Sequence, residues 1–294
     1  MKAIDHAALL AKPGRTIHLR DFDPGSTGKF DNKAHAERKL RVDIERLSTL
    51  QDMFYAQGQH AMLIVFQGMD AAGKDGAIKH VMSGVNPQGV DVSSFKTPST
   101  EELAHDYLWR STRALPQRGR IGIFNRSYYE ELGVVRVHAE LLAGEKLPPE
   151  AQPANVWNDR FQDIAAYERY LSRNGTLVLK FFLHLSKDEQ RKRLLERIDT
   201  PEKNWKISAA DVRERAYWDA YQHVYGEMLT HTSTEIAPWY IVPADHKWFT
   251  RAAVADIIVA RLDGLDLAYP RVSDEQRAEL VTEREKLTGE DESA

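Results

Sequence analysis

The chain has 294 residues, with 40 lysine and arginine side chains against 44 aspartate and glutamate, and 42% of its residues are apolar. This composition excludes a disordered chain, and the lack of cysteine excludes disulfides, thiolate metal sites and a cysteine nucleophile. No apolar run approaches the roughly 20 residues of a membrane helix, and the first residues lack the features of a secretory or transit signal. We therefore expect a cytoplasmic protein.

The formal net charge of −4 is unevenly distributed. Residues 274–294 carry eight acidic and three basic side chains, so the rest of the chain is close to neutral. A near-neutral body gives no electrostatic case for binding duplex nucleic acid, although a local basic surface for a polyanion is compatible with it. We expect 269–294 to form an acidic tail, either a solvated helix or a frayed end.

Apolar patterning divides the chain into alternating helices and strands. Residues 1–32 contain Pro-Gly and Asp-Pro-Gly turns and predict an irregular extension. The helical stripe at 33–57 is either core or an interface between copies. Largely apolar runs predict buried strands at 61–66, 121–124, 176–185 and 239–243, and 90–95 is expected to form a further short strand. Further helices are expected at 99–115, 155–174, 186–198, 208–231 and 248–262.

This order of elements predicts one α/β domain with five parallel strands and helices on both faces of the sheet. Ligands of such sheets bind beyond the carboxyl ends of the strands. The loops that follow the strands are therefore where functional residues are expected.

The segment after the first strand has the phosphate-loop pattern G-x-x-x-x-G-K, in the required context of strand before and helix after. In such a loop the backbone N–H groups converge on a phosphate at the helix N-terminus, and the lysine follows the transferring phosphoryl group. The residues expected to bind phosphate or nucleotide here are Gly68, Ala71, Ala72, Gly73, Lys74, Asp75 and Gly76.

Two acidic residues depart from the usual loop. Asp75 stands where a serine or threonine normally binds Mg²⁺, and it is either part of the site or a structural residue at the helix N-terminus. Asp70 lies inside the loop, where a carboxylate would repel phosphate unless a cation intervened. Asp70 is therefore expected to bind Mg²⁺ or to orient an acceptor oxygen, with Glu130 or Glu131 as a further source of metal ligands.

The third strand ends in Asn125-Arg126, where strands of this kind usually carry an aspartate for Mg²⁺. Arg126 is either a surface ion-pair partner or, as its place beside the loop favours, a ligand of phosphate. Arg136 interrupts an apolar stretch and needs a partner, which is either substrate phosphate or an internal carboxylate.

The segment 187–206 carries seven basic and five acidic residues. Such a segment is either a solvated helix with internal ion pairs or a lid that closes over phosphates and excludes water. Under the second interpretation, the cations that would face a polyanion are Arg191, Arg193, Arg197 and Lys206.

Several motifs together resemble the type 2 polyphosphate kinase family, over about residues 15–268. They are Gly-Met-Asp-Ala-Ala-Gly-Lys-Asp-Gly (68–76), Gly-Val-Asn-Pro-Gln-Gly (84–89), Asp-Tyr-Leu-Trp-Arg (106–110), Phe-Asn-Arg-Ser-Tyr-Tyr-Glu (124–130), Lys-Phe-Phe-Leu-His-Leu-Ser-Lys-Asp-Glu-Gln-Arg (180–191) and Ala-Pro-Trp-Tyr (237–240). The combination is far more specific than the phosphate loop alone.

The resemblance implies a three-layer α/β/α P-loop kinase fold like that of thymidylate kinase, with one domain at 33–268 and a helical lid at about 186–215. It implies reversible phosphoryl transfer between inorganic polyphosphate and nucleoside mono- or diphosphates, with nucleoside triphosphate as a product and Mg²⁺ or Mn²⁺ as cofactor. No nucleic acid or membrane partner is expected, and a homo-oligomer is an open alternative. By this resemblance, Asp70, Lys74, Arg126 and Arg136 would be catalytic. The asparagine at 125 resembles the residue found at this place in a subgroup that accepts AMP as well as ADP.

Two other functions compete with this interpretation. An ATP-dependent nucleoside monophosphate kinase would share the fold, but Asp75 and Asn125 remove two usual ligands of Mg²⁺–ATP. A non-catalytic phosphate-binding regulator would need the loop alone, and the retained Asp70, Lys74 and Arg126 weaken that alternative.

Overall fold

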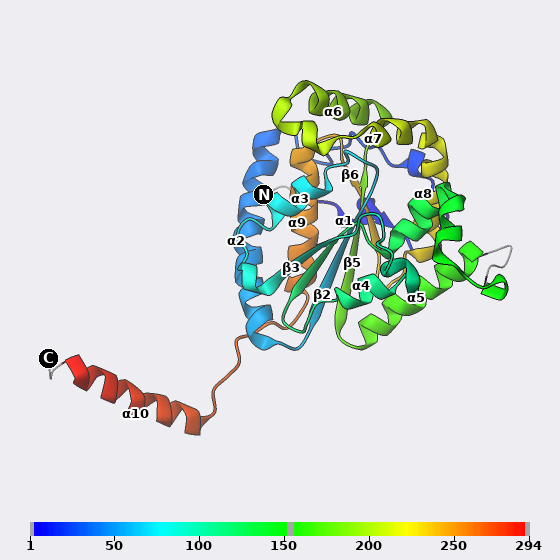
Figure 1. The fold of residues 1–294 in the computed structure, drawn as a ribbon. Helices are drawn as coiled ribbons and strands as arrows, with labels where there is room; N and C mark the ends of the chain where they lie inside the picture. Colours follow the sequence, from blue (N-terminus) through cyan, green and yellow to red (C-terminus); the bar gives the residue numbers. More distant parts are fainter. Residues whose placement is uncertain (1–2, 152–155, 292–294) are drawn as a thin grey trace.

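A twisted sheet lies between two layers of helices in the computed structural model, which describes residues 3–151 and 156–291 (Figure 1). The predicted three-layer α/β/α arrangement is confirmed. Asn155, the expected first residue of one helix, lies outside the described residues. Residues 1–2 of the N-terminal extension and 292–294 of the acidic tail also lie outside them.

The strands are β1 (Leu10–Ala11), β2 (Ala61–Gln67), β3 (Val90–Ser94), β4 (Ile121–Asn125), β5 (Thr176–His184) and β6 (Trp239–Pro243). The α-helices of the first half are α1 (His6–Leu9), α2 (Lys33–Gln57), α3 (Lys74–Val81) and α4 (Trp109–Arg113). Those of the second half are α5 (Val156–Arg173), α6 (Lys187–Asp199), α7 (Ala209–Glu214), α8 (Trp218–Thr232), α9 (Lys247–Asp263) and α10 (Asp274–Asp291).

The strand order is β1-β6-β5-β2-β4-β3, and all neighbours except β1 and β6 run parallel. Strand β2 is central and every one of its residues is buried. Ile64 and Phe66 face one helical layer while Leu63 and Val65 face the other. This two-sided burial explains why the strand is an uninterrupted apolar run rather than an alternating one.

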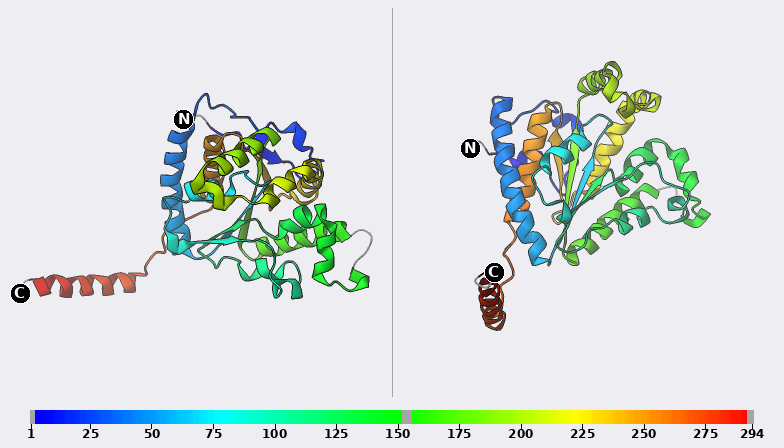
Figure 2. Two further views of the ribbon diagram at one scale, coloured as in Figure 1. Left: turned by 45° about the horizontal axis from the view of Figure 1, so that its top comes forward. Right: turned by 60° about the vertical axis from the view of Figure 1, so that its left-hand side comes forward.

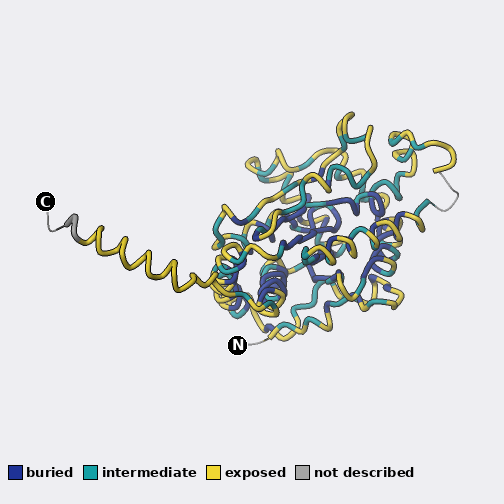
Figure 3. The backbone as a smooth tube through the Cα atoms, turned by 90° about the horizontal axis from the view of Figure 1, so that it is seen from below, coloured by how far each residue is buried: buried dark blue, intermediate teal, exposed yellow. Residues whose placement is uncertain are grey.

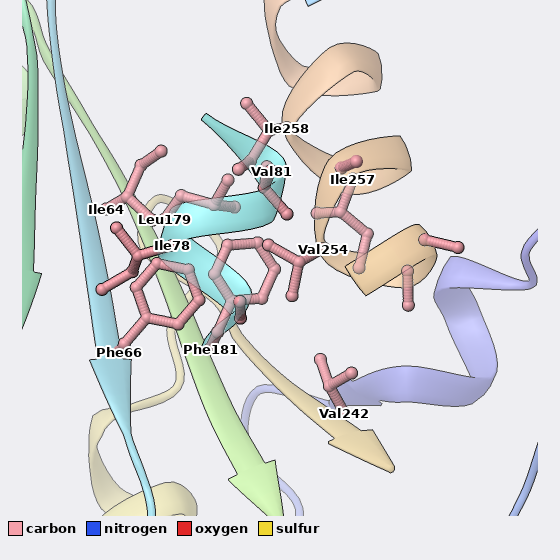
Figure 4. Close-up of a cluster of buried hydrophobic side chains, with 14 of the residues drawn as sticks. Ile64, Phe66, Ile78, Val81, Leu179, Phe181, Val242, Val254, Ile257 and Ile258 are labelled. Atoms are coloured by element: carbon pink, nitrogen blue, oxygen red, sulfur yellow. The ribbon is translucent and has the colours of Figure 1, made fainter. Parts of the chain in front are cut away.

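One helical layer consists of α2, α3 and α9 (Figure 1). Figure 4 shows Ile78 and Val81 of α3 and Val254 of α9 packed against Phe66 and Phe181 of the sheet. The apolar stripe of α2 is buried in the same layer, with Leu47 and Phe54 almost fully covered. The stripe is therefore core and not a free surface for a second copy.

The other layer consists of α5 and α8, and a buried ion pair lies beneath it. Lys180 of β5 donates to Glu168 of α5 at 2.6 Å and to the Tyr129 hydroxyl at 2.8 Å, and Tyr128 donates to Glu168 at 2.9 Å. Burial lowers the pKa of Lys180, whereas the Glu168 carboxylate opposes that change. A satisfied buried pair of this kind fixes α5 against the sheet.

The prediction of five strands was wrong by one, because the N-terminal extension is not wholly irregular. It contains α1 and the two-residue strand β1, in which Leu10 and Ala11 pair antiparallel with Tyr240 and Trp239 of β6. Within the described residues the sheet therefore has six strands. So short a strand has no period of its own and forms only because the β6 edge pairs with it.

The prediction of one helix over 99–115 was also wrong. The capping box is present, since the Ser99 N–H donates to Glu102 at 2.7 Å and the Glu102 N–H to the Ser99 hydroxyl at 3.2 Å. It starts only a 3₁₀ turn, Glu102–Ala104, and His105 is extended. Asp106 then accepts a bond from the Leu108 N–H at 3.0 Å, and this local turn competes with helix continuation before α4.

The helix expected at 208–231 is divided. Helix α7 is followed by a 3₁₀ turn, Arg215–Tyr217, and then by α8. Together with α6 and the 3₁₀ turn Pro201–Lys206, helix α7 forms an arch across the end of the sheet where α3 begins (Figures 1 and 2). We refer to 186–215 as the lid, a name that here denotes only the segment; its closure over substrate is part of the function proposed below.

Helix α10 extends away from the other elements (Figure 3). Its described side chains, 274–288, are all exposed. Among the residues that the structure describes, no helix is both long and apolar enough to cross a membrane.

Candidate active site

The loop between β2 and α3 wraps tightly because two glycines adopt backbone conformations that other residues rarely do. Gly68 has a φ of +141°, and a Cβ there would lie 2.6 Å from the carbonyl oxygen of Leu183. Gly73 has a φ of +103° and is the N-cap of α3. The loop therefore closes directly onto the positive end of the helix, which is an arrangement suited to binding an anion.

Lys74 is the first residue of α3 and its side chain turns back under the loop. Its ammonium donates to the carbonyls of Gly68 at 2.7 Å and Met69 at 3.3 Å. Burial, and then the charge of Arg126, lower the pKa of Lys74, while Asp70 raises it. An ammonium has three hydrogens, so this orientation leaves one for a phosphoryl oxygen at the loop.

Three charged side chains meet beside Lys74. Arg126 donates from Nη2 to Asp70 at 2.8 Å, and its Nη1 lies 3.6 Å from Glu130. The Arg126 N–H also donates to the carbonyl of Phe66 at 3.0 Å, which anchors the end of β4 to the end of β2. The predicted proximity of Asp70, Lys74 and Arg126 is thus what the fold produces.

Backbone strain is concentrated in the same place. Among the described residues other than glycine, positive φ occurs at Ala71 (64°), Arg126 (63°) and Lys146 (53°). Two of these three belong to the loop and to the arginine opposite it. Such conformations are costly and tend to occur at functional sites.

Asp75 and Asn125 contact each other, since the Asn125 amide donates to the Asp75 carboxylate at 2.6 Å. The bond joins the first turn of α3 to the tip of β4. Asp75 is exposed, and Gly76 follows it in the same helical turn. This geometry supports the structural interpretation of Asp75, because its carboxylate is already engaged within the protein.

The carboxylates near the loop fit a magnesium ion that is completed by substrate. Among the described residues no group of three or more His, Asp or Glu side chains could hold a metal ion. Mg²⁺ is commonly bound by one or two carboxylates together with phosphate oxygens, and Asp70 and Glu130 share one guanidinium. Burial raises the pKa of Glu130, whereas Arg126 lowers it.

Glu131, the other candidate, faces a different part of the molecule. It is buried and accepts from Arg160 of α5 at 2.9 Å, and Arg160 also donates to Glu145 at 2.6 Å. Of the two neighbouring acids, Glu130 is therefore the one that lies with the loop residues.

Arg136 has an internal partner. It donates to Glu227 of α8 at 2.5 Å, and its guanidinium carbon lies 5.4 Å from the centre of the Phe161 ring. Its Nη1 is buried without a hydrogen-bond partner in the described chain. Of the two partners considered from the sequence, the structure supplies the carboxylate.

The four lid cations divide into two groups. Arg191, Arg197 and Lys206 are exposed or half-buried, as a contact with a polyanion requires. Arg193 is only 5% exposed and donates to the carbonyls of Ala71 at 3.0 Å and Ala72 at 3.1 Å. This arrangement favours a structural role for Arg193 over the predicted contact with substrate.

Sequence reasoning missed one residue that touches the loop from the lid side and a second residue that is bonded to the first. Gln190 of α6 donates from Nε2 to the carbonyl of Asp70 at 2.9 Å, and Arg215 donates to Gln190 Oε1 at 2.7 Å. The available signal was positional, because Gln190 lies one turn before Leu194 and therefore shares its buried face of the helix.

Comparisons with known proteins identify the family of the chain. The family described as Polyphosphate kinase 2 (PPK2) matches residues 30–269. An ADP-polyphosphate phosphotransferase of Rhodopseudomonas palustris is 53% identical over 88% of this chain and 90% of its own length. An AMP/ADP-polyphosphate phosphotransferase of Meiothermus ruber is 46% identical over 88% of this chain and 94% of its own.

A solved structure shows the same likeness in three dimensions. The crystal structure of Polyphosphate Kinase 2 from Arthrobacter aurescens superposes with a TM-score of 0.83 at 37% identity, and the match covers 96% of this chain and all of that one.

Proposed function

The chain belongs to the polyphosphate kinase 2 family, and we propose that it transfers a phosphoryl group between inorganic polyphosphate and nucleoside mono- or diphosphates. In the forward direction the terminal phosphoryl group of polyphosphate moves to ADP or AMP, which yields ATP or ADP and a polyphosphate one unit shorter. The same bonds break and form in reverse. The observation that carries the proposal is the meeting of Lys74, Asp70 and Arg126 at the loop.

The roles of the individual residues follow from their charge and position. Phosphoryl transfer requires alignment and neutralisation of charge more than covalent chemistry. Lys74 would bind the transferring group, and Arg126 would exchange its bond with Asp70 for phosphate oxygens. Asp70 and Glu130 would hold Mg²⁺, which when bound neutralises phosphate charge and helps to align the reacting oxygens.

The lid would complete the site. A closed site excludes water, which would otherwise accept the phosphoryl group. Arg191, Arg197 and Lys206 are accessible cations on the lid, so they would face the polyphosphate chain. Arg136 is held by Glu227, and a role in catalysis would require the guanidinium to use its unpaired Nη1.

The direct test is ATP formation from ADP, long-chain polyphosphate and Mg²⁺, measured with a luciferase-coupled assay. We expect activity in the wild type and a loss of about 100-fold or more in Lys74→Met and Asp70→Asn. Lys79→Met is the matched control, because Lys79 is exposed on the same helix. Unchanged circular dichroism and melting temperature would show that the variants are folded.

Other outcomes would replace the proposal. ADP formation from AMP and ATP, without any use of polyphosphate, would indicate an ATP-dependent nucleoside monophosphate kinase. Calorimetric binding of polyphosphate without turnover of any nucleotide would indicate a phosphate-binding regulator. Near-full activity of both Lys74→Met and Asp70→Asn would contradict the roles assigned to these residues.

A further inference from the structure

One helix of the lid holds the backbone of the phosphate loop. The carbonyls of Asp70, Ala71 and Ala72 are consecutive, and all three accept hydrogen bonds from side chains of α6. Gln190 donates to the first, and Arg193 to the other two. Both side chains are buried, with Gln190 only 1% exposed, so water is a poor substitute for these bonds.

Gln190 is bonded at both ends of its amide. Its Nε2 donates to the Asp70 carbonyl at 2.9 Å, while its Oε1 accepts from Arg215 at 2.7 Å. Arg215 also donates to the carbonyl of Lys187 at 3.0 Å. Arg215 begins the 3₁₀ turn through which the lid returns to α8, so one side chain joins the end of the lid to the loop.

The chemistry of a primary amide makes this connection directional. Only the nitrogen can donate to the carbonyl, and only the oxygen can accept from the guanidinium. If Arg215 moves away, a buried amide oxygen loses its partner, and leaving such a group unsatisfied is unfavourable. A side chain in that state is held less firmly against the loop, so the strength of its bond to Asp70 depends on where Arg215 lies.

We propose that Gln190 is a positioning residue that couples the seating of the lid at Arg215 to the conformation of the phosphate loop at Asp70. With the lid seated, Gln190 holds the Asp70 peptide group and so stabilises the start of the loop. When Arg215 leaves, the loop loosens at that point. The coupling rests on the proposed function only in that the loop is where phosphate binds.

The test is hydrogen exchange of the full chain without substrate, followed in a peptide that covers 66–81. We expect exchange of this peptide to rise about fivefold in Gln190→Met and in Arg215→Met, the effect of losing one hydrogen bond on local opening. The double variant should exchange no faster than either single variant, because both remove the same connection. Lys192→Met, exposed on the same helix, should match the wild type.

Two results would overturn the proposal. One is wild-type exchange in both single variants. The other is a double variant whose effect is the product of the single effects, as expected if Arg215 and Gln190 act separately. If Gln190→Met fails to fold, Gln190→Glu decides, because it keeps an acceptor for Arg215 and loses the donor to Asp70. It should loosen 66–81 and leave 208–217 as in the wild type; unchanged exchange at 66–81 would contradict the coupling.

Turnover provides a separate readout. The coupling predicts that Gln190→Met lowers kcat about fivefold with little change in KM for ADP. A rise in KM for ADP at constant kcat would contradict it. Failure of the proposed function can be told apart from failure of the coupling. If the proposed function is wrong, neither the wild type nor any variant will turn over polyphosphate, whereas the exchange experiment, done without substrate, still tests the coupling.

Discussion

The inner and outer faces of α6 each carry an arginine, but one arginine is buried in hydrogen bonds and the other is exposed. Arg193 faces inward, is 5% exposed, and donates to the loop carbonyls of Ala71 and Ala72 and to the carbonyls of Ala244 and Asp245. Arg191, two residues earlier, has a side chain that is 63% exposed and that forms a long ion pair with Asp188 at 3.8 Å.

This difference shows that the number of cations on a helix says little about what each one does. An exposed ion pair contributes little and its guanidinium is easily redirected to a ligand. A buried guanidinium is bound to its partners, because removing it leaves several polar groups unsatisfied. The inner face of α6 therefore holds the loop, and the contacts that we propose with polyphosphate fall to exposed cations such as Arg191.

The largest expected effect is that of Arg193→Met. The variant leaves four buried or half-buried carbonyls without their donor, so the free energy of unfolding should fall by about 3 kcal/mol. For a domain of this size, that corresponds to a melting temperature roughly 6 °C lower, measurable by calorimetry. Turnover should fall as well, because the loop loses its support.

Arg191→Met is the control for this experiment and should melt with the wild type. If Arg193→Met instead kept the wild-type melting temperature and only raised KM for polyphosphate, the distinction between the two faces would be wrong. Arg193 would then contact substrate, as first expected from the sequence.

The second effect concerns the outer face and η8 (Pro201–Lys206). Replacing Arg191, Arg197 and Lys206 together by glutamine should raise KM for polyphosphate about tenfold at low salt. The melting temperature should change little. The difference from the wild type should shrink near 1 M salt, where the screening length is about 3 Å.

A matched control for that triple variant removes three cations elsewhere. Arg277, Arg284 and Lys286 are exposed on α10, which extends away from the other elements (Figure 1). Their replacement should leave KM unchanged. An equal rise in KM in both triple variants would show that net charge, and not the position of the lid cations, determines polyphosphate binding.

The smallest expected effect concerns the pH dependence of stability, and it compares a buried with an exposed acidic side chain on α2. Burial raises the pKa of Asp43 to about 6, although Lys39 beside it acts in the opposite direction. A carboxyl with a raised folded-state pKa holds its proton longer than in the unfolded chain, so its contribution to stability is lost as pH rises from about 4 to 6. Urea unfolding should show that Asp43→Asn loses less stability than the wild type over this range.

Asp52→Asn, on the exposed side of α2, should follow the wild-type pH dependence. If Asp43→Asn also followed it, Asp43 would be ionised throughout and paired with Lys39 at all these pH values.

Much of the fold could be predicted because its central elements are strongly patterned. The helix expected at 33–57 coincides with α2, and the strand expected at 239–243 coincides with β6. The strand expected at 61–66 ends one residue before β2 does. In these segments local preference and burial agree. Prediction failed where local preference and burial do not agree. Strand β1 exists only through its pairing with β6. The capping box at Ser99 is present, but it is followed by a 3₁₀ turn and not by the expected helix.

The candidate site divides in the same way. The residues of the loop are contiguous and their pattern carries a physical reason, so Lys74 and Asp70 were found without a structure. The support for the loop comes from far along the chain, since Gln190 reaches Asp70 across 120 positions. No local pattern encodes such a contact. The roles of Asp70, Lys74, Arg126 and Arg136 in catalysis stay predictions until the variants are assayed.

The pairing of β1 with β6 also has a consequence for biosynthesis. Leu10 pairs with Tyr240, and His6 reaches Asp256 at 2.7 Å, so this strand must wait for a partner that is translated much later. At roughly 5–20 residues per second, the delay is on the order of ten to fifty seconds. The first strand to leave the ribosome is therefore the last that can join the sheet, and a nascent chain stalled before residue 239 would keep it single.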